Sequence, residues 1–126
     1  MNDSYSIILQ NHSNEGVLRL VLNDLDSKNS LSEKMMNSLM DAISSASKDK
    51  SVKVIVIAAN GNVFSAGHNL KDITEARSND DYGDAYFNKL FDTCSSLMKM
   101  IVRCSKPVNA EVNGIAAAAG WRLVAS

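Results

Sequence analysis

Two segments of the chain each combine a β-branched strand, a turn rich in glycine and alanine, and the start of a helical pattern. The first runs from residues 52–59 to a turn at 65–70, and the second from residues 108–112 to an alanine-rich stretch at 115–119. Small residues let a ligand approach the backbone, where unpaired N–H groups can point at one negative oxygen. Two such donors would make an oxyanion hole, contributing about 2.7–4 kcal/mol each to a transition state. Close helix–sheet packing would need the same residues, so both interpretations stay open.

The carboxylates near these turns do not suggest an acid–base pair. Glu111 alternates with Asn109 along one strand, which favours a shared, partly solvated face. Asp72 and Glu75 are spaced as neighbours on a helix, and such residues are commonly a solvated helix face. We therefore predict that none of them is catalytic.

The cysteines suggest packing rather than chemistry. Cys94 and Cys104 lie in or near one apolar helical pattern, with no CxxC motif and no histidine cluster beside them. This spacing favours buried free thiols over a disulfide or a metal site.

Three strands are predicted to carry or flank the first turn. Apolar residues alternate at 5–9 and 17–22, which predicts two strands joined by a polar turn. Residues 52–59 are β-branched and almost continuously apolar, which is typical of a strand covered on both faces in a parallel sheet.

Two long helices are predicted around that central strand. The first begins at Ser30, with Glu33 completing a capping box, and its apolar stripe ends near the polar run at 47–51. The buried face of the second runs from Phe87 to Ile101.

The remaining segments complete an alternating pattern. Residues 63–70 are too rich in small and turn-forming residues to predict a strand. Pro107 separates the second helix from a strand at 108–112, and residues 115–124 have the composition of a tightly packed helix. Strands alternating with helices predict an α/β architecture with crossover units. The last helical pattern is still open at Ser126, as in a domain that has been cut.

Composition narrows the classes of function. The chain has 126 residues, 45% of them apolar, and a formal net charge of −1, as expected of at most one soluble globular domain. This charge gives no reason to expect nucleic-acid binding, and no apolar stretch is long enough to span a membrane. Residues 1–10 lack the patterns of a secretory signal or transit peptide, which favours a cytoplasmic location.

Longer motifs resemble one family. Residues 52–73, VKVIVIAANGNVFSAGHNLKDI, closely resemble the first oxyanion-hole segment of the crotonase (enoyl-CoA hydratase/isomerase) superfamily, and residues 108–126, centred on VNGIAAAAG, resemble the second. Asn29 lies in a segment similar to the family's loop before its first helix, with Leu25 in place of the usual proline. The resemblance covers the whole chain. It implies a crotonase-like (ClpP/crotonase) spiral of repeated ββα units, of which residues 1–126 would be the N-terminal portion of a single domain without its C-terminal portion.

The resemblance also implies a ligand. The family binds acyl-CoA thioesters in fatty-acid metabolism and stabilises the thioester oxyanion or enolate with two backbone N–H groups, which by position are those of His68 and Ala119. The implied substrate-binding residues are Ser65, Ala66, Gly67, His68, Asn69, Leu70, Lys71 and Ala119. Asn69 replaces the family's usual aspartate. Coenzyme A would be part of the substrate, so no separate cofactor and no metal are expected.

One departure from the family bears on catalysis. Arg122, preceded by Trp121, occupies the position of a catalytic glutamate in hydratases of the family, and the second such glutamate would lie beyond residue 126. Arginine stays protonated at physiological pH and cannot act as the acid or base. The sequence therefore predicts no hydratase activity for this chain alone.

Three functions stay open. The chain could be part of an enoyl-CoA hydratase/isomerase, a non-catalytic acyl-CoA-binding or oligomerisation module, or an interaction module without acyl-CoA affinity. Lys28 and Lys71 are candidates to meet the coenzyme A phosphates, although exposed lysines commonly have no ligand. A homo-oligomer is expected, since the family commonly forms trimers or dimers of trimers.

Overall fold

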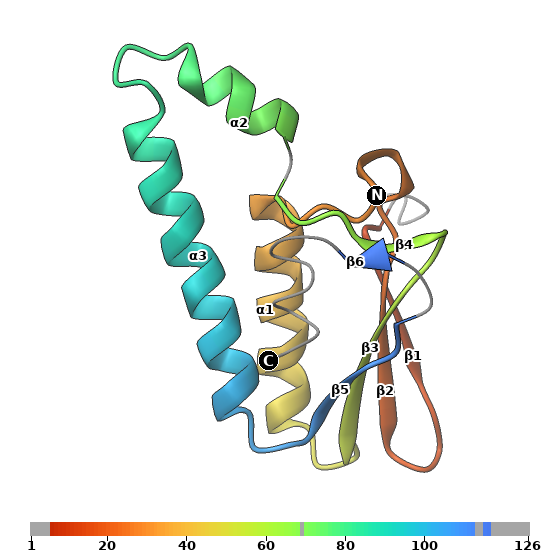
Figure 1. Cartoon of the computed structure of the whole chain (residues 1–126). Helices are drawn as coiled ribbons and strands as arrows, with labels where there is room; N and C mark the ends of the chain where they lie inside the picture. Colours follow the sequence, from red (N-terminus) through yellow and green to blue (C-terminus); the bar gives the residue numbers. More distant parts are fainter. Residues whose placement is uncertain (1–5, 69, 113–114, 117–126) are drawn as a thin grey trace.

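The computed structural model describes residues 6–68, 70–112 and 115–116 of the chain (Figure 1). The elements are β1 (Ile8–His12), β2 (Val17–Leu22), the 3-10 helix η2 (Leu25–Ser27), α1 (Glu33–Lys48), β3 (Val54–Ala59), β4 (Val63–Ser65), α2 (Leu70–Arg77), α3 (Asp84–Arg103), β5 (Val108–Ala110) and β6 (Ile115–Ala116). The predicted alternation of strands and helices is therefore confirmed over most of its length.

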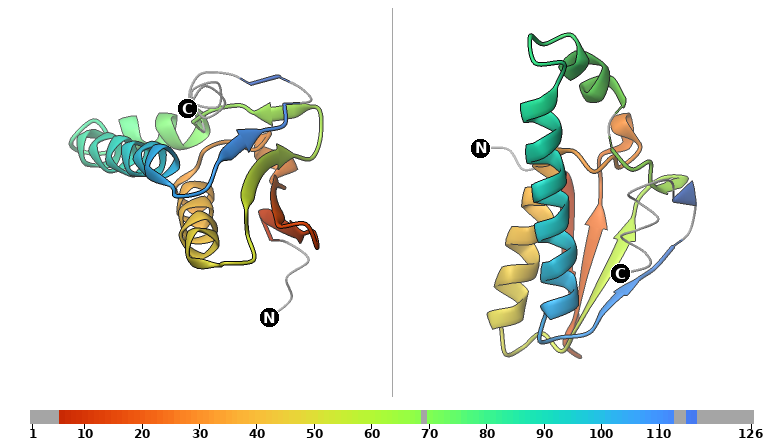
Figure 2. Two further views of the ribbon diagram at one scale, coloured as in Figure 1. Left: turned by 90° about the horizontal axis from the view of Figure 1, so that it is seen from below. Right: turned by 60° about the vertical axis from the view of Figure 1, so that its left-hand side comes forward.

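Four of the strands form one sheet in the order β1-β2-β3-β5. β1 pairs with β2 antiparallel, whereas β2–β3 and β3–β5 are parallel. The parallel pairs need crossovers, which α1 supplies between β2 and β3. Both views of Figure 2 show α1 and α3 next to each other on one side of this sheet.

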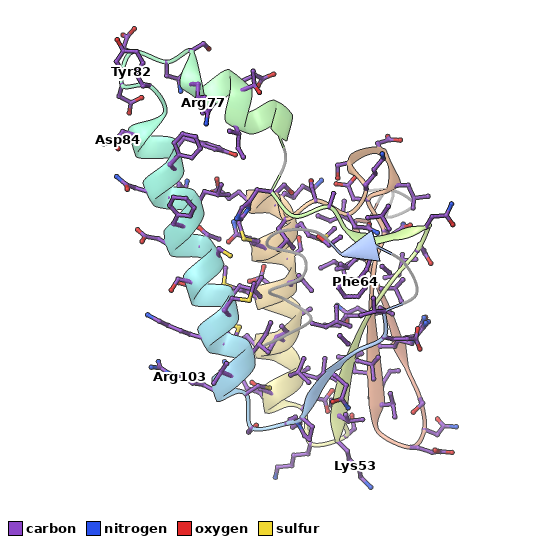
Figure 3. The ribbon with its side chains drawn as sticks, viewed as in Figure 1. Lys53, Phe64, Arg77, Tyr82, Asp84 and Arg103 are labelled. Carbon is purple, nitrogen blue, oxygen red and sulfur yellow. The ribbon has the colours of Figure 1, made fainter. Side chains whose placement is uncertain are left out.

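The core lies between that face of the sheet and the two long helices. α1 and α3 each present an apolar stripe to it, as their periodicity predicts. The prediction is wrong for Phe91, which lies within the predicted buried face of α3 but is exposed. Fully buried members include Leu20, Leu22, Ile55 and Ile57 from the sheet, Met35, Met36, Leu39 and Ile43 from α1, and Leu97 from α3. Phe64 of β4 is also fully buried and lies where β4 meets the core (Figure 3).

The predicted start of α1 is wrong by two residues. The N-cap is Ser32, whose Oγ accepts a hydrogen bond from the Met35 N–H at 3.1 Å, and the helix begins at Glu33. Ser30 is buried instead. The physical reason is that the Leu31 N–H donates to the Gly67 carbonyl at 2.6 Å, which keeps this part of the chain outside the helix.

The ends of three strands also differ from the prediction. β1 covers residues 8–12 rather than 5–9. The reason is its pairing with β2, which runs from the Ile8–Leu22 pair to the His12–Leu18 pair. β3 begins at Val54, two residues after the predicted start, and β5 ends at Ala110, two residues before the predicted end.

The prediction that residues 63–70 contain no strand is wrong, and so is the helix predicted to begin at Ile115. Residues 63–65 form β4, which pairs in parallel with β6 as a separate two-stranded sheet. Pairing between segments about fifty residues apart supplies backbone partners that local composition does not reveal. The rest of the predicted C-terminal helix, residues 117–124, lies outside the described residues. α2, residues 70–77, is an additional helix between the turn and α3.

A tight turn joins α2 to α3. Gly83 has φ +86°, and an added Cβ there would lie 3.0 Å from the Ala76 carbonyl oxygen, so the position favours glycine. The Asp81 carboxylate accepts hydrogen bonds from the N–H groups of Gly83 and Ala85 at 3.0 and 2.9 Å. The bond from Ala85, followed by that from Gly83, lowers the pKa of Asp81 from its ordinary value of 3.8.

Within the described part of the chain, no helix is long and apolar enough to cross a membrane.

Candidate functional site

The first predicted turn begins at the end of β4 with a buried serine. Ser65 is fully buried, and its hydroxyl donates to the Asn29 carbonyl oxygen at 2.8 Å. The Ser65 hydroxyl oxygen in turn accepts a hydrogen bond from the Gly67 N–H at 3.2 Å. One side chain therefore joins the turn to the loop before α1 and also closes the turn on itself.

Backbone hydrogen bonds hold the next two residues against the same loop. The Ala66 N–H donates to the Lys28 carbonyl at 3.0 Å, and the Gly67 carbonyl accepts from the Leu31 N–H at 2.6 Å. Gly67 has φ +80°, which other L-residues rarely adopt. The conformation of the turn therefore requires glycine, whether or not a ligand also approaches the backbone at this point.

The loop that receives the turn is itself held by Asn29. This residue is fully buried and, like Lys28, has φ +55°, in the left-handed region. Its side-chain NH₂ donates to the carbonyls of Asn60 and Val63, both at 3.0 Å, and its Oδ1 accepts from the Asp24 N–H at 2.8 Å. We call residues 24–31 and 60–68, with these hydrogen bonds, the turn network.

This role of Asn29 was not predicted from the sequence, where Asn29 stood out only as part of a family-like segment. The available signal was its residue type, because asparagine tolerates the left-handed region better than most residues. Its partners, Asn60 and Val63, are more than thirty residues away in the sequence. No local pattern identifies them.

His68 ends the described part of the turn. Its side chain is half-buried, and Nδ1 lies 3.5 Å from the Leu31 carbonyl oxygen, at the limit of a hydrogen bond. Among the described residues, its backbone N–H meets no hydrogen-bond acceptor. The turn is thus a firmly held backbone that ends in an N–H donor without an acceptor in the described part of the chain.

Some of the predicted site residues lie outside this description. Asn69, Ala119 and Arg122 are not among the described residues. Leu70 and Lys71 begin α2, but their side chains are not described. The structure therefore brings together Ser65, Ala66, Gly67 and His68, and it leaves the rest of the predicted site untested.

The other described candidate residues lie in separate places and do not form a reactive cluster. Lys28 is exposed beside the turn. Glu111 is exposed and forms an ion pair with Arg19 across the sheet, which confirms its predicted solvated position. Cys94 is buried, as predicted, and Cys104 is only partly buried; within the described residues the two cysteines form no disulfide. In the described ranges, no three His, Cys, Asp or Glu side chains are grouped to hold a metal ion.

A groove of about 510 Å³ lies between the C-terminal parts of α1 and α3. It is lined by Ile43, Met100, Lys99, Arg103 and several serines, and none of its residues belongs to the turn network. We therefore assign the candidate site to the turn and not to this groove.

Comparisons with known proteins agree with the fold. Residues 12–126 match the family described as enoyl-CoA hydratase/isomerase. The chain is 43% identical over 121 residues to the Xenopus laevis protein named enoyl-CoA hydratase domain-containing protein 3, mitochondrial, covering 96% of this chain and 38% of that protein.

Two solved structures are similar over 94% of this chain. The human enoyl-CoA hydratase domain-containing protein 3 has a TM-score of 0.83 at 37% identity, with 45% of that chain covered. An enoyl-CoA hydratase from Mycobacterium smegmatis has a TM-score of 0.85 at 42% identity, with 44% covered. This chain therefore spans less than half the length of these proteins.

The predicted cytoplasmic location is contradicted by the same comparison. The Xenopus, mouse and human relatives are all named as mitochondrial proteins. The first ten residues, on which that prediction rested, were a poor guide to location.

The solved structures also test the fold class predicted from the sequence. The overall similarity to these two structures, over 94% of this chain, confirms the predicted crotonase-like α/β fold class. The chain belongs to the enoyl-CoA hydratase/isomerase family and corresponds to the N-terminal part of its crotonase fold.

Proposed function

We propose that this chain binds an acyl-CoA thioester at residues 65–68, with the His68 backbone N–H donating to the thioester carbonyl oxygen. The observation that carries this proposal is the turn itself, whose backbone is held at Ala66 and Gly67 while the next N–H meets no acceptor among the described residues. A donor that is fixed before the ligand arrives stabilises negative charge without the cost of reorganisation.

The proposed site needs a second donor and a binding surface. We assign the second N–H to Ala119, and further acyl-CoA contacts to Asn69, Leu70 and Lys71, by their positions in the family-like motifs. Lys28 is exposed next to the turn, which supports a role in meeting the coenzyme A phosphates. Coenzyme A enters as part of the substrate.

The proposed chemistry is stabilisation of a thioester oxyanion or enolate in the fatty-acid metabolism of the β-oxidation type. Water addition needs one group to activate water and another to protonate carbon. Arg122 occupies the first of the family's two carboxylate positions, so this chain alone is proposed to bind acyl-CoA without hydrating it. The same substitution favours a second candidate, a non-catalytic acyl-CoA-binding or oligomerising member of the family.

Two further proposals concern the location and the assembly of the protein. We propose a mitochondrial location for the whole protein, because the named relatives are mitochondrial. We also propose that the chain forms a homo-oligomer. Light scattering would test this, and a monodisperse monomer would contradict it.

Calorimetric titration with crotonyl-CoA tests the binding proposal, with free coenzyme A as the matched ligand that lacks a thioester. Crotonyl-CoA should bind more tightly than coenzyme A. Gly67→Val should weaken crotonyl-CoA binding by about 1–3 kcal/mol, because valine is strained at φ +80° and crowds the turn. His68→Ala should change it little, since only the backbone is used.

The opposite result would reject the backbone assignment. If His68→Ala abolishes binding while Gly67→Val, shown to be folded by circular dichroism, leaves it unchanged, the imidazole is the functional group. Hydratase activity is followed separately by loss of enoyl absorbance. Turnover by the pure chain would reject its assignment as a binding protein.

A further inference from the structure

We propose that Ser65 and Asn29 are positioning residues that set the direction of the His68 N–H. This inference rests on the proposed function, since it explains how the donor to the thioester carbonyl is aimed. Neither side chain is required to touch the ligand. Both are fully buried and act through the backbone.

The direction of the His68 N–H follows from the peptide bond that joins it to Gly67. In a planar trans peptide, the N–H points opposite to the carbonyl of the preceding residue. The Gly67 carbonyl accepts from the Leu31 N–H at 2.6 Å. The His68 N–H therefore points away from Leu31, and anything that moves the Gly67 carbonyl turns this donor.

Ser65 fixes the other end of Gly67. Its hydroxyl has one proton and two lone pairs, and it uses the proton on the Asn29 carbonyl and a lone pair on the Gly67 N–H. Gly67 is thus held at both its N–H and its carbonyl. Without the hydroxyl, a buried N–H and a buried carbonyl would each lose a partner, and the turn would relax to satisfy them.

Asn29 holds the loop whose carbonyl groups accept the hydrogen bonds of the turn. The carbonyls of Lys28 and Asn29 accept from the Ala66 N–H and the Ser65 hydroxyl, and both residues have φ +55°. Such conformations persist only where surrounding contacts hold them. The three side-chain hydrogen bonds of Asn29 provide these contacts.

The neighbouring Ser30 provides a matched control. It is also a buried serine, with an exposed fraction of 1%, but its hydroxyl makes no hydrogen bond among the described residues. Ser30→Ala and Ser65→Ala therefore remove the same atom from equally buried positions. Only the second change breaks the proposed positioning contacts.

The test uses crotonyl-CoA labelled with ¹³C at the thioester carbonyl and infrared difference spectroscopy at ligand saturation. A carbonyl that accepts hydrogen bonds absorbs at lower frequency, so the wild-type chain should lower the carbonyl frequency on binding. Ser65→Ala and Asn29→Asp should each lose at least half of this shift, and Ser30→Ala should keep it. Ser65→Cys, with a weaker donor of similar shape, should give an intermediate value.

The outcomes separate this inference from the proposed function. If the wild type shows the shift and Ser65→Ala keeps it in full, the positioning role is overturned while acyl-CoA binding stands. If the wild type neither binds crotonyl-CoA nor shifts its carbonyl, the proposed function fails.

Amide hydrogen exchange in the unliganded protein tests the network without any ligand. The Gly67 N–H should exchange at least tenfold faster in Ser65→Ala than in Ser30→Ala. Equal exchange in the two folded variants would overturn the positioning role.

Discussion

The turn network and the α2–α3 arm, residues 70–103, are held by different kinds of interaction. In the network, Asn29 and Ser65 are fully buried, and each makes hydrogen bonds to backbone groups of another segment. The arm is held mainly by apolar packing of α3 along α1, with Leu97 fully buried. Towards its tip, Phe91 and Tyr82 are 60% and 81% exposed, and Figure 3 shows Tyr82 at the far end from Arg103.

This difference shows which interactions suit a site that uses backbone donors. Apolar contacts are non-directional, so they determine where a helix lies better than where a single N–H points. Hydrogen bonds weaken steeply when misaligned and therefore constrain angles. The network has the directional contacts that an oriented donor needs, while the arm has the packing that a long covering helix needs.

The largest expected effect is on the packed part of the arm. Leu97→Ala should lower the free energy of unfolding by about 2–5 kcal/mol, because it leaves a cavity between α3 and α1. Chemical denaturation measures this change. The control is Phe91→Ala on the same helix, which should cost less than about 1 kcal/mol because Phe91 is largely exposed and mainly loses its stacking on Phe87. Similar costs for the two would mean that the arm is not held by its buried stripe.

Removal of the asparagine from the turn network should have the next largest effect. Asn29→Ala leaves the carbonyls of Asn60 and Val63 without the side-chain donor, at a cost of about 2–4 kcal/mol in the free energy of unfolding. Hydrogen exchange should also rise for Gly67, whereas Leu97→Ala should leave Gly67 exchange unchanged in the folded state. If Leu97→Ala loosens Gly67 equally, the two regions are not held independently.

A smaller and pH-dependent effect is expected at the start of α3. The pKa of Asp81 is lowered from 3.8 by hydrogen bonds from Ala85 and Gly83, so its carboxylate stabilises the fold above that value. The contribution is lost as pH falls through the lowered pKa of the folded state. Asp81→Asn should therefore be less stable than the wild type near about pH 6, and the difference should shrink towards about pH 2.5. A difference that is constant with pH would exclude a role for the charge.

The smallest effect is expected for the ion pair that links the arm to α1. Lys89 Nζ lies 2.9 Å from Glu33 Oε1, and the two side chains are 68% and 44% exposed. Lys89→Met should change the free energy of unfolding by less than about 1 kcal/mol, and about 1 M salt should remove the difference. Lys34→Met is the control at an exposed lysine of α1. A cost above 2 kcal/mol for Lys89→Met would show that charge, and not packing, holds the arm.

Local pattern predicted much of the fold. β2, the long helices α1 and α3, and the central apolar strand were all found from periodicity, because their buried faces repeat along the chain. β4 and β6 were missed, since short strands need a partner that lies far away in the sequence. The start of α1 was misplaced because Leu31 is bonded to Gly67, a contact that its own neighbours do not encode.

For the candidate site, too, the sequence determined some features and only the tertiary structure determined others. The order of residue types from Ser65 to His68, and the resemblance that they carry, determined where an oxyanion-binding turn is expected. Only the tertiary structure decided that Asn29 and Ser65 hold this turn, because their hydrogen bonds join segments about thirty to forty residues apart. Side-chain periodicity is written along the chain, whereas the direction of one backbone N–H depends on which distant groups complete its hydrogen bonds.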